Sequence, residues 1–264
     1  MRHGEHDLVI YRCSGGIAEI VLNRPDKLNA ISDDVALSLR HALEQFDDDP
    51  DAYVGILYGL GRAFCSGADV KQRQLRSDEE MRRLGGPQGR GPKTADMLFG
   101  MTNWKPVISA VHGYAVGAGL RLALETELIV AEEGAKFQVT ETSRGVDGSI
   151  FWRLMSKGGA TAFADEVSLT GRFWTAEEGA QAGLISRVTD KGTYLEEARS
   201  LAGAIMANPP LAVRQIVRVR RAEIQRMELA YSLSEARDLH LSADFRESAR
   251  AFAERRAPGP WLGR

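Results

Sequence analysis

Two glycine-rich turns are the segments of this sequence whose residue types and spacing best suit chemistry. One of them follows an apolar, β-branched run from Val107 to Val111 and contains Gly113, Gly117 and Gly119. Glycine adopts positive φ without steric cost and lets the backbone approach a ligand closely. A helix after such a turn begins with unpaired N–H groups that carry partial positive charge. The turn therefore predicts a site for a developing oxyanion, and tight helix–strand packing is the alternative explanation of its glycines.

The other turn lies upstream, in the segment RAFCSGADVKQ of residues 62–72. Gly67 and Ala68 stand where a predicted strand at 53–58 has given way to loop or helix. Backbone N–H groups from both turns could donate to one substrate oxygen. Together the turns predict a single site that stabilises negative charge on that oxygen.

Alternating strand and helix patterns must position these turns. Apolar and period-two runs predict strands at 8–12, 17–22, 53–58, 107–111, 127–131 and 184–188. Helical spacing predicts helices at 33–47, 78–84, 94–103, 120–126, 161–169 and 176–182, and further helices from Tyr194 onward with a break at 208–210. Strands early and helices late predict an α/β core over residues 1–195 and a C-terminal helical region over 196–264.

Composition limits the class of protein. The chain has 264 residues, a net charge of −2 and two cysteines. This charge argues against a generic nucleic-acid binder, and the basic face formed by Arg214, Arg218 and Arg221 is typical of a solvated helix. Two cysteines make no disulfide framework, the N-terminus has no apolar signal core, and no apolar run is long enough to span a membrane. We therefore expect a cytoplasmic protein.

Residues 72–93 differ in character from the rest of the chain, with five arginines, four glycines and few apolar side chains. The composition is typical of a loop that interrupts the core. Two interpretations remain open: the arginines are solvated, or they lie near an anionic ligand.

Five segments resemble one known family. They are NRPDKLNAIS (23–32), AFCSGADVK (63–71), PVISAVHGYAVGAGL (106–120), FQVTETSRGV (137–146) and AFAERRAPGPWLGR (251–264). They occur in the order found in the crotonase, or enoyl-CoA hydratase/isomerase, superfamily. The resemblance implies a spiral of ββα units, followed by a helical region that mediates assembly into a homotrimer or hexamer. It also implies a coenzyme A thioester as substrate, with no metal and no separate cofactor.

The resemblance further assigns residues to the substrate. The N–H groups of Ala68 and Ala118 would form the oxyanion hole for the thioester oxygen. The CoA-binding positions carried over from the family lie in the two turns, in the loop after the second strand, and near the C-terminus: Lys27, Leu28, Ala30, Ser66, Ala68, Asp69, Val70, Lys71, Gly117 and Arg255. In the family the last of these can reach the CoA of a neighbouring subunit.

Catalysis in family hydratases uses two glutamates that hold a water molecule. Glu141 matches the second glutamate, but Arg121 occupies the position of the first. A single glutamate can still shuttle a proton between carbons. Arg121 could pair with Glu141, bind a polar group of the substrate, or turn to solvent. Glu125, one helical turn further on, is the expected i,i+4 partner of Arg121.

Two other residues are weaker candidates. Asp147 falls in the loop expected to border the acyl pocket and could act as a second carboxylate. His112, between strand and glycine turn, could act as a base, but we interpret it as structural.

Three functions therefore follow from the resemblance. The first is an acyl-CoA enzyme of the hydratase/isomerase type, with Glu141 as acid/base and proton transfer favoured over hydration. The second is another crotonase-type reaction, such as decarboxylation, C–C cleavage or dehalogenation, in which Arg121 recognises the substrate. The third is a CoA-thioester-binding or RNA-associated protein without turnover, against which Glu141 and the intact glycine turn argue.

Overall fold

Two β-sheets form the framework of the computed structural model, which describes residues 7–84, 104–157, 159–232 and 239–264. The larger sheet has the order β1 (Val9–Ser14), β2 (Ile17–Leu22), β3 (Val54–Gly59), β4 (Val107–Val111), β6 (Leu128–Glu132) and β9 (Arg187–Thr189). The smaller sheet contains β5 (Tyr114–Val116), β7 (Lys136–Gln138) and β8 (Phe173–Thr175). The pair β1–β2 is antiparallel, and the other pairs of the larger sheet are parallel.

The chain alternates between the two sheets. After β4 it enters the smaller sheet as β5 and continues into helix α4 (Ala118–Glu125). After β6 it again enters the smaller sheet as β7 and continues into the 3-10 helix η2 (Thr142–Arg144) and helix α5 (Ser149–Lys157). These strand–strand–helix repeats confirm the predicted α/β fold of ββα units.

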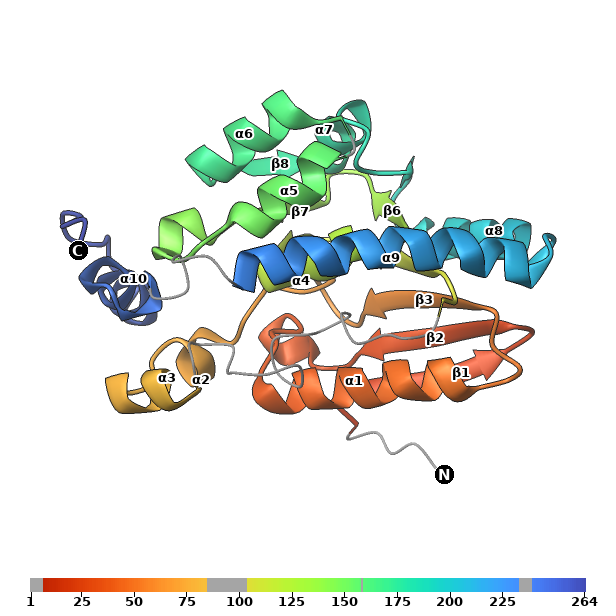
Figure 1. The fold of residues 1–264 in the computed structure, drawn as a ribbon, viewed down its shortest axis with the longest axis horizontal. Helices are drawn as coiled ribbons and strands as arrows, with labels where there is room; N and C mark the ends of the chain where they lie inside the picture. Colours follow the sequence, from red (N-terminus) through yellow and green to blue (C-terminus); the bar gives the residue numbers. More distant parts are fainter. Residues whose placement is uncertain (1–6, 85–103, 158, 233–238) are drawn as a thin grey trace.

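The remaining helices cover the sheets and extend the chain (Figure 1). They are η1 (Pro25–Lys27), α1 (Asp33–Asp48), α2 (Val70–Arg73), α3 (Asp78–Leu84), α6 (Thr161–Thr170), α7 (Ala176–Gln181), α8 (Tyr194–Met206), α9 (Pro210–Ser232) and α10 (Ala243–Glu254). Among the described residues no helix is long and apolar enough to cross a membrane.

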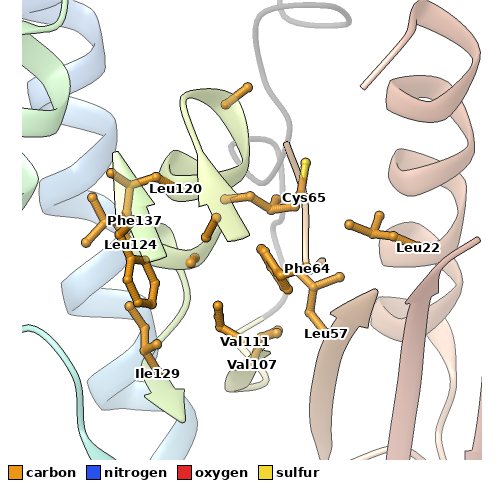
Figure 2. Packing of buried hydrophobic residues seen from close by; sticks show 14 of the residues in the cluster. Leu22, Leu57, Phe64, Cys65, Val107, Val111, Leu120, Leu124, Ile129 and Phe137 are labelled. Atoms are coloured by element: carbon orange, nitrogen blue, oxygen red, sulfur yellow. The ribbon is translucent and has the colours of Figure 1, made fainter. Parts of the chain in front are cut away.

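Both faces of the larger sheet are buried. On one face, Ala198 and Ala202 of α8 pack against strand residues such as Ile56 and Ile108. On the other, α1 and α4 pack against the sheet, and Figure 2 shows Leu120 and Leu124 of α4 in this cluster. Parallel strands buried on both faces explain the continuous apolar runs in the sequence.

Helix α1 illustrates how the sequence sets these elements. Its N-cap Ser32 accepts a hydrogen bond from the Val35 N–H at 3.2 Å. At its other end, the Lys105 ammonium donates to the carbonyl oxygens of Phe46, Asp47 and Asp49 at 2.8, 2.9 and 2.7 Å. A cation on the unpaired carbonyls of a helix C-terminus is favourable because it complements the helix dipole.

The sequence-based boundaries agree with most of these elements. The helix predicted at 78–84 is α3, whereas α4 begins at Ala118, two residues before its predicted start, and β9 lies at Arg187–Thr189 rather than 184–188. The three strands of the smaller sheet escaped prediction because each has only three residues, too few for a period-two pattern. The helix predicted at 94–103 lies outside the described residues.

Candidate active site

The upstream turn, which contains Gly67 and Ala68 and is called the first turn below, is fixed by a short bridge to Ile31. The Ile31 N–H donates to the Gly67 carbonyl at 2.8 Å, and the Asp69 N–H donates to the Ile31 carbonyl at 2.9 Å. In a parallel bridge of this kind the central residue, Ala68, directs its own N–H away from Ile31. The Ala68 N–H is therefore left out of this pairing.

The second turn is the junction of β5 and α4. Gly117 has φ 50° and ψ −122°, a conformation that residues with a Cβ rarely adopt. A Cβ there would lie 2.6 Å from the Thr140 hydroxyl oxygen. Ala118 is the first residue of α4. Its N–H therefore has no carbonyl acceptor four residues earlier within the helix. The N–H of Ala118 is thus oriented outward at a helix start.

Direct contacts hold the two turns together. The Cys65 N–H donates to the Tyr114 carbonyl and the Val116 N–H donates to the Cys65 carbonyl, both at 3.0 Å. A Cβ added to Gly67 would lie 2.7 Å from the Val116 carbonyl oxygen and 3.6 Å from the Ala118 nitrogen. The structure therefore brings the predicted oxyanion-hole residues Ala68 and Ala118 to adjacent positions.

Gly119 permits this close approach. A Cβ on Gly119 would lie 2.4 Å from the Cys65 carbonyl oxygen and 2.7 Å from the Cys65 Cβ. Real Cβ atoms do not come this close to other non-bonded heavy atoms, so any side chain at this position must push α4 away from the Gly67–Ala68 turn. The glycine is required by packing between the turns and not by its own φ.

The Glu141 carboxylate lies against Gly117 of the second turn. It precedes η2, and a Cβ on Gly117 would lie 3.3 Å from its Oε1 and 3.8 Å from its Oε2. Although Glu141 keeps partial solvent exposure, burial raises the pKa of its carboxyl to about 7, while the nearby charge of Arg121 and hydrogen bonds from Thr140 act in the opposite direction. A carboxyl with a pKa near neutrality can both accept and return a proton.

Arg121 is buried beside this carboxylate. Its side chain pairs with Glu125 on the next turn of α4, with 2.9 Å between Arg121 Nε and Glu125 Oε1. The two residues are only 5% and 4% exposed. The expected i,i+4 pair is confirmed, and the alternative in which Arg121 turns to solvent is wrong. Arg121 acts on Glu141 through its charge rather than through a direct ion pair.

The Asp147 carboxylate is hydrogen-bonded to Ser149. Its Oδ1 accepts from the Ser149 N–H at 2.8 Å and its Oδ2 accepts from the Ser149 hydroxyl at 3.0 Å. Both bonds stabilise the start of α5. Asp147 also lines a cavity of about 990 Å³ between η2, α5, α6 and the C-terminal segment. The contacts favour a helix-capping role for Asp147.

The loop after β2 holds an unusual backbone. Leu28 and Asn29 are consecutive non-glycine residues in the left-handed region, with φ of 49° and 55°. The buried Asn29 amide compensates for this by donating to the carbonyl oxygens of Leu60 and Ala63 at 2.9 and 2.8 Å. The strained backbone is therefore anchored to the segment that leads into the first turn.

The predicted CoA-binding loops lie side by side. The Ser66 N–H donates to the Leu28 carbonyl at 2.9 Å, and the Arg24 guanidinium joins the Ala30 carbonyl to the Asp69 carboxylate at 3.0 and 2.8 Å. Burial acts to raise the pKa of Asp69, but the hydrogen bonds from Arg24 and the backbone outweigh it and lower that pKa. Asp69 is thus an ionised structural residue and the N-cap of α2.

Three basic residues complete the predicted CoA site. Lys27 and Lys71 are exposed near these loops, and Val70 begins α2. Arg255 follows α10 with φ 56° and an exposed side chain. The reach of Arg255 to the CoA of a neighbouring subunit stays a prediction.

His112 is held by contacts of a structural kind. Its Nε2 lies 2.9 Å from the Gly61 carbonyl oxygen, and its ring stacks on Tyr194 of α8 with 4.9 Å between centroids. These contacts support the structural interpretation.

One charged residue near Glu141 escaped the sequence-based prediction. Arg144 ends η2 and lies three residues after Glu141, a spacing that repeats after one turn of a 3-10 helix. The signal was present in the segment TETSRGV, but only the 3-10 geometry places both residues on one side.

Comparison with known proteins agrees with this arrangement. Residues 12–263 match the family model described as enoyl-CoA hydratase/isomerase. An enoyl-CoA hydratase of Mycobacterium tuberculosis is 35% identical over 90% of this chain and 91% of its own length. A carnitinyl-CoA dehydratase of Salmonella typhi is 36% identical over 95% and 97% of the two chains. The crystal structure of a carnitinyl-CoA hydratase from Mycobacterium avium superposes with a TM-score of 0.81 at 32% identity, covering 98% of this chain and all of the other.

The fold and the sequence matches together define a class of protein that acts on acyl-CoA thioesters. The chain belongs to the enoyl-CoA hydratase/isomerase family.

Proposed function

We propose that this family member moves a proton between carbon atoms of an acyl-CoA, with Glu141 as its acid/base. The N–H groups of Ala68 and Ala118 stabilise the enolate that forms when the α-proton is removed. The observation that carries this proposal is the placement of the Glu141 carboxylate against Gly117, on the turn whose next residue supplies one N–H donor.

Proton transfer is favoured over hydration because the site offers one well-placed carboxylate. Arg121, at the position of the family's first glutamate, pairs with Glu125 and carries the opposite charge. Asp147 is engaged by Ser149. Among the described residues, water therefore has no pair of carboxylates to position and deprotonate it, whereas a single glutamate with a pKa near 7 can deliver the proton it has accepted.

The direct test is exchange of acyl protons with solvent. In D₂O the protein should incorporate deuterium at the α- or γ-carbon of at least one enoyl- or acyl-CoA in a panel of chain lengths. Gly119→Val should abolish this exchange and weaken acyl-CoA binding, because the side chain displaces the Ala118 N–H. Loss of one oxyanion donor costs about 3 kcal/mol, or more than a hundredfold in rate.

Gly203→Val provides the matched control. Gly203 lies in α8, and a Cβ added to it meets nothing within 4 Å. This variant should keep binding and exchange. A folded Gly119→Val protein with unchanged binding and exchange would refute the oxyanion-hole assignment.

We also propose that the chain forms a homotrimer or hexamer through the helical region at 196–264. Leu211 and Ile216 on α9 are 77% and 72% exposed, and the terminal Trp261 is 51% exposed. Apolar side chains this open on one helix favour burial against another copy. Sedimentation velocity at micromolar concentration should therefore give a trimer or hexamer, and a monomer would contradict the proposal. The cytoplasmic location stays a prediction.

A further inference from the structure

Arg144 shares the catalytic side of η2 with Glu141. The Arg144 N–H donates to the Glu141 and Thr140 carbonyl oxygens, both at 3.0 Å, which closes the turn between them. A 3-10 helix has three residues per turn, so side chains three apart lie above one another. Thr142 and Gly145 line the cavity between η2, α5 and α6.

The Arg144 guanidinium contacts an aromatic ring and interacts with Glu141 through charge alone. Its central carbon lies 3.9 Å from the centroid of the Phe252 ring on α10. Within the part of the chain that the structure describes, no hydrogen bond or ion pair reaches this guanidinium. Phe252 therefore fixes the plane of the group while leaving its five N–H donors for another acceptor.

Helix α10, which carries Phe252, provides no hydrogen-bond acceptor for this guanidinium among the described residues. The Ser248 hydroxyl of α10 donates to the Ser143 carbonyl at 3.2 Å, which holds α10 over η2. Arg144 is partly buried, and this burial acts against its charged state, while the Glu141 carboxylate supports it. A guanidinium that is desolvated in part and lacks an acceptor gains from an anionic ligand.

The charge of Glu141 does not satisfy Arg144. The carboxylate supports the charged guanidinium, but no hydrogen bond joins the two side chains among the described residues. When Glu141 takes a proton from the substrate, its negative charge passes to the enolate oxygen, so the total charge is unchanged but Glu141 no longer supports Arg144. An anionic group on the substrate would give the guanidinium a partner before and after the transfer.

We propose that Arg144 binds a carboxylate carried by the acyl group, so that the substrates are CoA thioesters of dicarboxylic acids. The inference rests on the proposed function, because it assumes that the reacting carbons lie against Glu141. Arginine suits this task because its planar donors match a carboxylate in two parallel hydrogen bonds. A CoA phosphate offers similar chemistry but would require the other end of the substrate at this position.

Binding of unreactive saturated thioesters tests the proposal independently of turnover. Calorimetry should compare succinyl-, glutaryl- and adipoyl-CoA with butanoyl-, pentanoyl- and hexanoyl-CoA, and with free CoA. At least one dicarboxylic thioester should bind about tenfold or more tighter than its monocarboxylic counterpart, as expected for charged hydrogen bonds. Equal affinities in all three pairs would overturn the inference.

Variants separate the possible sources of the effect. Arg144→Leu should remove the preference while leaving the affinity for pentanoyl-CoA within about twofold, and Arg144→Lys should retain part of it. The control Arg187→Leu removes an exposed charge on β9 and should change neither. If Arg144→Leu weakens dicarboxylic, monocarboxylic and free CoA alike, the residue contacts a CoA phosphate and the carboxylate assignment is wrong.

The same data distinguish this inference from the proposed function. Failure of the proposed function appears as no exchange of acyl protons in D₂O, or as no binding of any acyl-CoA, by the wild-type protein. Failure of the inference alone appears as normal binding without a preference for the second carboxylate.

Discussion

Replacing Glu141 with glutamine should reduce exchange of the substrate's α- or γ-protons by at least a hundredfold. The amide has nearly the shape of the carboxylate but cannot accept the proton, and general acid/base groups typically contribute 10²- to 10⁴-fold. Binding of acyl-CoA should stay nearly intact, because the loss is confined to the transition state. Deuterium incorporation measured by mass spectrometry and affinity measured by calorimetry give the two quantities.

A control at another glutamate isolates the effect of position. Glu133 is an exposed residue in the turn after β6, and Glu133→Gln removes the same charge away from the site. That variant should exchange protons at the wild-type rate. Exchange that survives in Glu141→Gln would assign the base elsewhere, with Asp147 as the next residue to test.

The pH profile of the wild-type protein provides a second readout. Burial raises the pKa of Glu141 to about 7, so the carboxylate is protonated below that pH and ionised above it. Only the ionised form accepts a substrate proton. Exchange per unit of bound substrate should therefore rise with pH through about 7 and level off above it. A rate that stays flat from pH 5 to 8 would contradict the assignment of Glu141 as base.

The local parts of this site could be predicted from sequence because they depend on near neighbours. Positive φ at Gly117 and the i,i+4 pair of Arg121 with Glu125 each follow from residues within one turn, whereas the start of α4 at Ala118 lies two residues before its predicted position. Glycine and helix-start patterns have few structural alternatives over such short spans. The resemblance to the crotonase superfamily then gave the order of the ββα units, which local patterns alone do not specify.

Contacts between distant segments account for what the sequence left open. The burial of Arg121 was undecided because it depends on segments from elsewhere in the chain that pack on α4, such as α9, whose Arg220 donates to the α4 carbonyls of Leu124 and Glu125 at 3.1 and 2.7 Å. The role of Arg144 was missed because Phe252, which positions it, lies in α10. No pattern of polar and apolar residues encodes such pairings between separate helices.

Placing a glutamate at position 121 should raise hydratase activity well above that of the wild type. Two carboxylates could then hold and deprotonate a water molecule for addition to a 2-enoyl-CoA. Arg121→Glu alone would place two carboxylates one helical turn apart in a buried site. The double variant Arg121→Glu/Glu125→Gln avoids this, since the amide can donate a hydrogen bond to the new carboxylate. Hydration of crotonyl-CoA should rise about 100-fold over wild type, within the range of one general acid/base group.

The matched control is Arg121→Gln/Glu125→Gln, which removes the same cation without adding a carboxylate. It should hydrate crotonyl-CoA no better than wild type, so that the gain is assigned to the new carboxylate and not to the loss of Arg121. Both double variants lose the charge that lowers the pKa of Glu141, so their proton exchange should require a higher pH. Robust hydration of crotonyl-CoA by the wild-type protein would contradict the interpretation that Arg121 prevents hydration. Asp147 would then have to leave Ser149 and serve as the second carboxylate, and Asp147→Asn should abolish that hydration.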